Sequence, residues 1–143
     1  MKFVIAFAIT CIFIMEPLYA NDTSGVLVAS KSSPVEKSSI IEIRRLYLGL
    51  SSSNENLATR PVMNTADLKT YKLFLKNVMH MTENGYRRKI VKRIFRQGGE
   101  KIKEINSLEK LTQHLNKNTN DISFIDAETA KKTKELKVIQ RLW

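Results

Sequence analysis

Residues 25–49 have the sequence GVLVASKSSPVEKSSIIEIRRLYLG, and this stretch decides the fold. Its first five residues, 25–29, form an apolar run bounded by polar residues, which predicts a buried strand. Further along, Ser39 and Glu42 have the spacing of a capping box, in which each side chain binds a backbone N–H at a helix start. Apolar residues at helical spacing then predict a helix over residues 40–48, and the glycine that follows lies where a left-handed cap is expected. A strand followed by a capped helix indicates an α/β chain.

The same signals continue to the end of the chain. A second strand is expected at residues 57–63, where Pro61 indicates an edge position. A long helix with apolar residues from Leu68 to Met79 on its inner side is expected next, capped by Asn64 or Thr65. The remaining expected elements are a helix at 82–95, a connecting segment at 101–105, a helix at 107–115, a strand at 122–125, a short helix or turn at 127–132 and a strand at 136–139. Strands separated by helices predict an α/β sandwich, a sheet covered by helices.

The first twenty residues have the order of a secretory signal peptide. Lys2 precedes an apolar run over residues 3–15, and Pro17 and a small residue, Ala20, follow it. The run is shorter than the roughly 20 residues that a helix needs to cross a bilayer, so a retained anchor is disfavoured. We therefore expect residues 1–20 to be a cleaved signal peptide, residues 21–143 to be one domain, and the protein to be periplasmic.

Cysteine and charge restrict what the exported domain can be. The only cysteine, Cys11, lies inside the signal peptide, so disulfides and thiolate sites are excluded from residues 21–143. A lipid-attachment role for Cys11 is disfavoured because the residues after it continue the apolar run. The chain has 24 Lys and Arg against 14 Asp and Glu, a net charge of +10. Such a surface attracts anions, and export disfavours nucleic acid as the partner; the alternative is a lysine-rich surface that only interacts with water.

The sequence shows no arrangement typical of a catalytic or metal centre. His80 and His114 lie far apart without metal-ligand spacing, and neither a carboxylate pair nor a serine–histidine arrangement is evident. We therefore expect a non-enzymatic domain with no catalytic residues, no metal and no cofactor.

The order of these elements resembles a known family. The resemblance rests on the strand at 25–29, the helix at 40–49 that ends in Leu-Tyr-Leu-Gly, Phe74 in the next helix, and the segments 107–115 and 121–126. This set is similar to small proteins related to the phosphate-binding component of ABC-type phosphate importers, a branch of the type II periplasmic binding proteins. The resemblance implies a single lobe with a mixed sheet flanked by helices. Full-length members have two lobes that close on an oxyanion, so half of that clamp is missing here.

The resemblance also implies where phosphate or a related anion would bind. Hydroxyl groups after the first strand, the start of the helix after the second strand, and an arginine at a helix end supply the candidates: Ser30, Ser32, Ser33, Thr65, Asp67 and Arg96. The alternatives are a flexible polar loop for the serines, a plain N-cap for Thr65 and Asp67, and a favourable helix-dipole position for Arg96. Residues 60–67 also lack the glycines that let a backbone approach the ligand in full-length relatives.

The helix expected at residues 82–95 is the most basic element of the chain. Its positive side chains are an expected docking surface for an acidic envelope protein or an anionic envelope surface: Arg87, Arg88, Lys89, Lys92 and Arg93. Two hypotheses follow. One is a periplasmic solute-binding-like protein with weak affinity for an oxyanion; the other is an adaptor or scaffold that has lost its ligand and docks through this helix.

Overall fold

The computed structural model describes residues 23–51 and 58–143. The expected signal peptide, residues 1–20, and its cysteine lie outside them. The strands are β1 (Gly25–Ser30), β2 (Arg60–Asn64), β3 (Lys103–Ile105), β4 (Asp121–Asp126) and β5 (Leu136–Arg141). The helices are α1 (Ile40–Tyr47), α2 (Leu68–Phe74), the π-helical turn η1 (Leu75–Met79), α3 (Glu83–Gln97), α4 (Leu108–Lys117) and α5 (Ala127–Lys132).

The strands form one mixed sheet in the order β3-β2-β4-β1-β5. Strand β2 is parallel to both β3 and β4, whereas β1 is antiparallel to both β4 and β5. The strand nearest the N-terminus therefore lies between the two strands nearest the C-terminus and runs against both.

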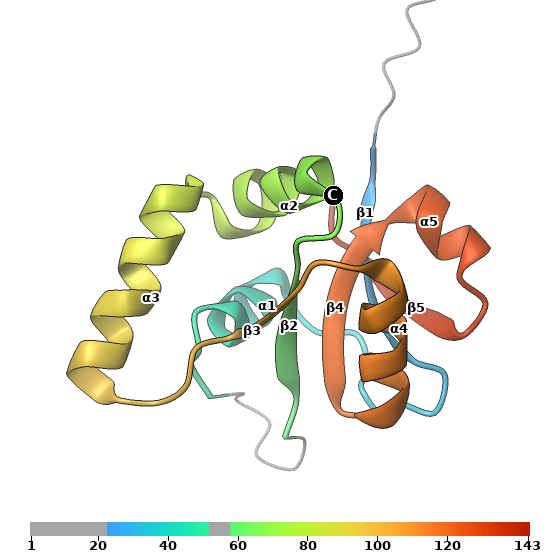
Figure 1. Ribbon diagram of the computed structural model, residues 1–143, viewed down its shortest axis with the longest axis horizontal. Helices are drawn as coiled ribbons and strands as arrows, with labels where there is room; N and C mark the ends of the chain where they lie inside the picture. The colour runs from blue at the N-terminus through green and yellow to red at the C-terminus, as the bar shows by residue number, and fades with distance from the viewer. Residues whose placement is uncertain (1–22, 52–57) are drawn as a thin grey trace, which may run out of the picture.

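Helices cover both faces of the sheet in three layers (Figure 1). Alternate residues of β1 point to opposite faces, as the period of a strand requires. Leu27 and Ala29 belong to the larger core, under α1, α2, η1 and α3, and Val26 and Val28 belong to the smaller core, under α4 and α5. The expected α/β sandwich, with a mixed sheet flanked by helices, is confirmed.

Three aromatic rings fill the centre of the larger core. Phe74 of α2 stacks on Phe124 of β4 with the ring centroids 3.8 Å apart, and the edge of Tyr47 meets Phe74 at 4.7 Å. Burial raises the pKa of Tyr47 well above its usual value, so its hydroxyl stays protonated and donates to the carbonyl of Val62, 3.1 Å away. The core thus joins α1, the end of α2 and two central strands.

Several helix ends follow the sequence signals. Ser39 caps α1 by accepting from the Glu42 N–H at 3.1 Å, and Ser107 caps α4. Gly49 has a φ of 74°, the left-handed conformation expected after α1. Its missing side chain also leaves room for the guanidinium of Arg93, which would clash with a Cβ at this position.

The expectations for β2, β3 and Leu68 were wrong. Strand β2 is not an edge strand, because β3, expected only as a connection, pairs with its outer side. The pairing of β2 with β3 begins at Val62, so Pro61 pairs with β4 alone. The N–H that proline lacks is therefore not needed for the hydrogen bonds between β2 and β3. Leu68, expected inside, is 64% exposed because α2 begins there, beyond the edge of the core.

Candidate anion site and docking surface

The carboxyl ends of β2 and β4 meet at one edge of the sheet, where folds of this kind place ligands. Asn64 ends β2 and is buried; its amide donates to the carbonyl of Phe124 at 2.9 Å and accepts from the N–H of Ala66 at 2.9 Å. The N–H of Thr65 donates to the carbonyl of Ile105 at 2.9 Å. The N–H groups of Thr65 and Ala66 are therefore bound to the protein itself.

Asp67, rather than Asn64 or Thr65, is the N-cap of α2. Its carboxylate accepts from the N–H of Lys69 at 3.0 Å and from the hydroxyl of Thr70 at 2.6 Å. The hydrogen bond from Thr70 is the main cause that lowers the pKa of Asp67. A negative charge already occupies the positive end of the helix dipole, where an oxyanion would otherwise bind.

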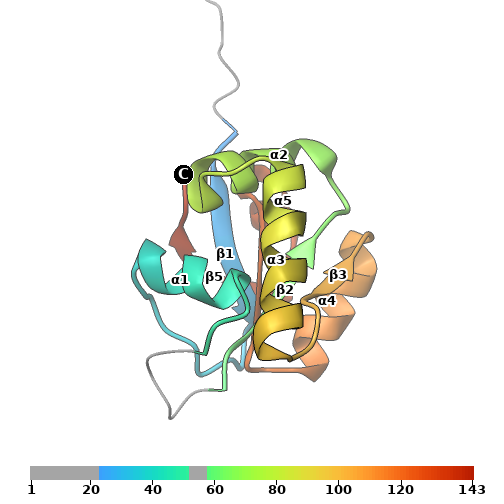
Figure 2. The same cartoon turned by 90° about the vertical axis from the view of Figure 1, so that its left-hand side faces the viewer.

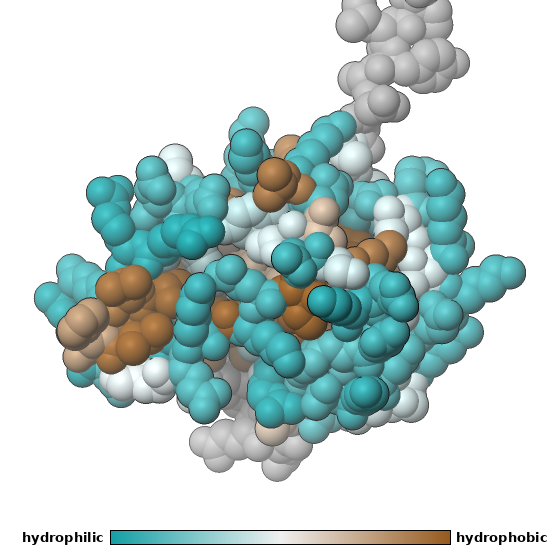
Figure 3. Space-filling view, viewed as in Figure 1, coloured by the Kyte–Doolittle hydropathy of each residue, from teal (hydrophilic) through white to brown (hydrophobic). Residues whose placement is uncertain are grey.

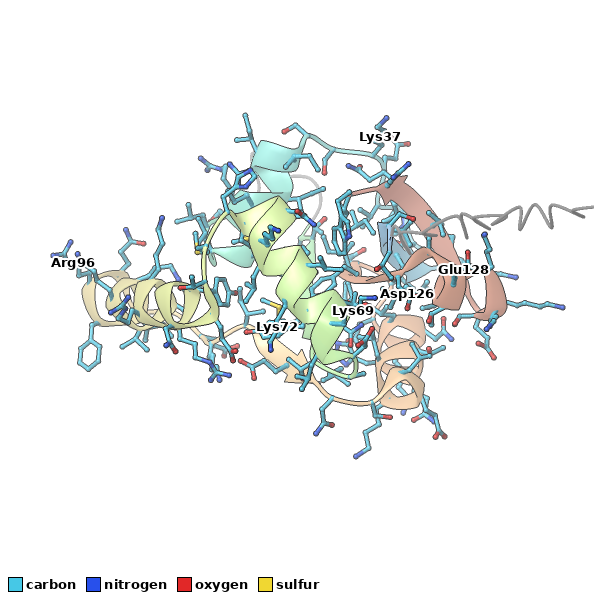
Figure 4. The ribbon with its side chains drawn as sticks, turned by 90° about the horizontal axis from the view of Figure 1, so that it is seen from above. Lys37, Lys69, Lys72, Arg96, Asp126 and Glu128 are labelled. Carbon is cyan, nitrogen blue, oxygen red and sulfur yellow. The ribbon has the colours of Figure 1, made fainter. Side chains whose placement is uncertain are left out.

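A second carboxylate lies at the same edge of the sheet. Asp126 ends β4, and its side chain caps α5 by accepting from the N–H of Thr129 at 2.8 Å. Figure 4 shows Asp126 near Glu128 of the same turn, on the side of Lys69 away from α3. Two of the helices that start at this edge, α2 and α5, therefore have an aspartate as N-cap, and these carboxylates repel a phosphate dianion.

Because a carboxylate caps α2, part of the free energy of unfolding is expected to be lost in acid. Asp67→Ala is expected to lower the free energy of unfolding by about 1 kcal/mol at neutral pH. Because folding lowers the pKa of Asp67, the contribution of its charge is present above the usual aspartate pKa, about 4, and is lost as pH falls through the lowered value. Urea unfolding at several pH values measures this. Asp67→Asn is the control, since asparagine caps as well and does not titrate; an equal acid dependence in that variant would contradict the assignment.

The structure does not bring the three candidate serines to this edge. Ser30 ends β1, and because β1 runs against β4, it lies opposite Leu136 at the other end of the sheet. Strand β4 has six residues, which span about 17 Å at 3.4 Å per residue, so the serines are about that far from Thr65. Ser30 and Ser32 have their hydroxyls 3.1 Å apart, and Ser33 accepts from the N–H of Val35. The loop is thus held by its own hydroxyls.

Arg96 is separated from the other candidates as well. It lies in the last turn of α3, and Figure 4 shows it at one extremity of the molecule, away from Lys69 and Asp126. The six candidate anion-binding residues therefore lie in three separate places.

Helix α3 stands at one side of the molecule in Figure 1 and faces the viewer in Figure 2. Only Tyr86 and Ile90 of this helix are buried; the hydroxyl of Tyr86 donates to the carbonyl of Tyr47 at 2.7 Å. Val91 and Phe95 share the helical spacing of Tyr86 and Ile90, yet they are 53% and 87% exposed. The reason is that the body covers a narrower strip of the helix than the apolar pattern implies.

The basic side chains of α3 have unequal roles. Arg87 pairs with Glu83 at 2.9 Å, one turn earlier on the same helix. Arg93 is partly buried and donates to the carbonyls of Gly98 and Glu100, so it holds the turn after the helix. Arg88, Lys89, Lys92 and Arg96 are exposed, and among the described residues they have no hydrogen-bonding or ion-pair partner. These four are available for a partner.

A shallow apolar cavity of about 210 Å³ lies between α3 and the segment that leads to β3. The side chains that line it are Met63, Tyr86, Arg87, Ile90, Val91, Ile94, Lys101, Ile102 and Glu104. It is smaller than the roughly 300–1,000 Å³ of pockets that bind small molecules. Its apolar wall continues onto the exposed side of α3 at Val91.

One polar cluster was not predicted from the sequence. His114 of α4 contacts the buried carboxylate of Asp121 at 2.7 Å, and Arg60 of β2 contacts its other oxygen at 3.0 Å. The sequence signal for this cluster was Asp121, a charged residue at the start of the apolar strand β4. The cluster ties α4 and β2 to β4, a structural task. Within residues 23–51 and 58–143, no three His, Cys, Asp or Glu side chains gather as metal ligands would. None of the helices in those ranges has the length and apolar character to span a bilayer.

Comparison with known proteins supports the fold. No protein-family model and no curated protein matches the chain. Among solved structures, the chain is similar to an ABC-type phosphate transport receptor from Vibrio cholerae, with a TM-score of 0.60 and 17% sequence identity. The similarity covers 82% of this chain and 46% of the receptor, so the chain spans less than half the length of that protein. The chain has a periplasmic-binding-protein-like fold, as the sequence predicted, without being a close relative of the receptor.

Proposed function

We propose that this protein is an exported adaptor, a single lobe of the periplasmic-binding-protein-like fold that docks on an anionic component of the cell envelope through α3. The observation that carries this proposal is the unpaired positive charge of α3: Arg88, Lys89, Lys92 and Arg96 face solvent beside exposed apolar side chains. Export follows from the expected signal peptide at residues 1–20 and is in keeping with a fold shared with a transport receptor.

The occupied edge of the sheet supports an adaptor over a phosphate carrier. The N–H groups of Thr65, Ala66 and Lys69 already donate to protein oxygens, and the Asp67 carboxylate sits where the anion would. A ligand would have to displace a carboxylate from its own helix, at a cost of about 1 kcal/mol beyond its own desolvation. Weak oxyanion binding at Thr65 is the second candidate function, favoured by the likeness to a phosphate receptor.

Calorimetric titration with phosphate and sulfate separates these two functions. We expect no binding tighter than about 1 mM, equivalent to about −4 kcal/mol. Asp67→Ser is expected to bind phosphate more tightly than the original chain, because it removes the competing carboxylate and keeps a hydroxyl cap. Sub-millimolar binding by the unaltered protein that Thr65→Ala weakens would establish the solute-binding function instead.

Docking through α3 is tested by sedimentation with a bacterial envelope fraction. Neutralising three free cations of α3, in Arg88→Gln/Lys92→Gln/Arg96→Gln, is expected to release most of the bound protein at low salt. The matched control, Lys131→Gln/Lys132→Gln/Lys134→Gln, makes the same change in net charge at and beyond α5 and is expected to remain bound. Equal release of both variants would show a non-specific effect of net charge and would refute the α3 surface.

A further inference from the structure

We propose that the anionic component is a lipid bilayer, and that the outer side of α3 binds it with Phe95 and Val91 inserted among the acyl chains. This inference rests on the proposed function and names the partner of the same surface. Arg88, Lys92 and Arg96 would lie at the level of the lipid phosphates. A helix with basic residues beside exposed aromatic and aliphatic ones is the arrangement that binds in the plane of a membrane interface.

The spacing along α3 sets two ridges next to each other. Val91 and Phe95 are four residues apart, and Arg88, Lys92 and Arg96 are spaced by four and four, so each set follows one side of the helix. Figure 3 shows apolar side chains gathered at the end of the molecule that α3 forms, with hydrophilic surface around them. The apolar and cationic side chains therefore lie next to each other along the exposed side of α3.

The exposed side chains of Val91 and Phe95 protrude from α3, and this favours a bilayer over a protein as the partner. Phe95 is 87% exposed and does not line the nearby cavity, so its side chain protrudes from the surface. A protein partner needs a shaped pocket for such a side chain, whereas a bilayer accepts it without one.

Charge argues against a second copy of the chain as the occupant. The net charge of +10 makes two copies repel, and α3 is the most basic helix, so apposition of two α3 surfaces would place like charges together. Anionic lipids instead attract each Lys or Arg near the surface by about 1 kcal/mol, about fivefold in the partition coefficient.

The body of the protein holds one side of α3 and leaves the other side free for this contact. Tyr86 and Ile90 fasten one side of the helix to the larger core, and Arg93 fastens its end to the turn at Gly98. The exposed ridges lie on the remaining surface of the same helix. The apolar side chains are thus presented without any unfolding of the domain.

Vesicle co-sedimentation tests the proposal with two kinds of liposome, pure phosphatidylcholine and phosphatidylcholine with phosphatidylglycerol. The protein starts at Asn21, since the apolar run at residues 3–15 would bind vesicles itself and both cores lie within the described residues. We expect binding to the anionic vesicles that weakens with salt. Arg88→Gln/Lys92→Gln/Arg96→Gln is expected to lower the partition coefficient about 100-fold, while the three-lysine control at and beyond α5 retains it.

The Phe95→Ser variant tests whether the side chain inserts into the bilayer or whether the attraction between cations and anionic lipid alone explains binding. It is expected to lower the partition coefficient at least tenfold, because one side chain buried in the bilayer is lost. Ile41→Ser is the matched control, since Ile41 is 68% exposed on α1 and is expected to leave binding unchanged. Both side chains are exposed, so both variants fold, which circular dichroism verifies.

Two outcomes would overturn the lipid proposal. Equal affinity of the Phe95→Ser variant would show that no side chain inserts. Absence of vesicle binding, with envelope sedimentation that still depends on the α3 cations, would assign the surface to an acidic protein and leave the adaptor function intact. Loss of both the vesicle binding and the envelope dependence would refute the adaptor function together with the inference.

Discussion

Phe124→Ala is expected to lower the free energy of unfolding by about 3–5 kcal/mol, a large part of the stability of a domain of this size. The ring is fully buried, stacks on Phe74 at 3.8 Å and meets the edge of Tyr47 at 5.9 Å. Removing it leaves a cavity at the contact between α2 and the centre of the sheet, where neither backbone can collapse easily. Urea unfolding followed by circular dichroism gives the difference.

Phe95→Ala makes the same chemical change at a site that is 87% exposed. It is expected to alter the free energy of unfolding by less than about 0.5 kcal/mol. A loss near that of Phe124→Ala would show that Phe95 packs against the body, and it would remove the basis for an inserting side chain.

Asn64→Ala is expected to cost about 2–4 kcal/mol, because it removes a buried side chain and leaves the buried Phe124 carbonyl and the Ala66 N–H without their partner. Asn64→Asp keeps the acceptor for Ala66 but sets a carboxylate oxygen against the Phe124 carbonyl, so it is expected to be destabilising also. Asn84→Ala, on the exposed side of α3, is the control and should be close to neutral. Chemical denaturation measures all three; a neutral Asn64→Ala would mean that water replaces the amide at no cost.

Local signals predicted most of the elements of this fold. The strand at 25–29, the helix at 40–48 and the strand at 122–125 were found because apolar runs, capping serines and Gly49 act through neighbouring residues. Strand β3 was missed since only Ile105 of its three residues is buried, which leaves almost no apolar pattern. Its existence depends on pairing with β2, a contact that no local signal reports.

The candidate site was harder to predict because it depends on strand direction. The expectation for Ser30 assumed that β1 ends at the same edge as its neighbours, and its antiparallel orientation puts it at the other edge. Asp67 was identified correctly as a residue of the α2 start, but sequence alone does not distinguish a carboxylate that binds a ligand from one that caps the helix. The exposure of Phe95 depends on how much of α3 the body covers, which is again a tertiary property.

The position of β1 has a consequence for the order in which the protein can fold. Val26 pairs with Ile125 of β4 on one side and Arg141 of β5 on the other, so the first strand made has partners only among the last residues made. Chains whose contacts join distant residues fold slowly, and their unpaired strands expose apolar side chains and unpaired backbone N–H and C=O groups in the meantime. A chain that is still being synthesised therefore cannot complete its sheet until its two C-terminal strands have been made.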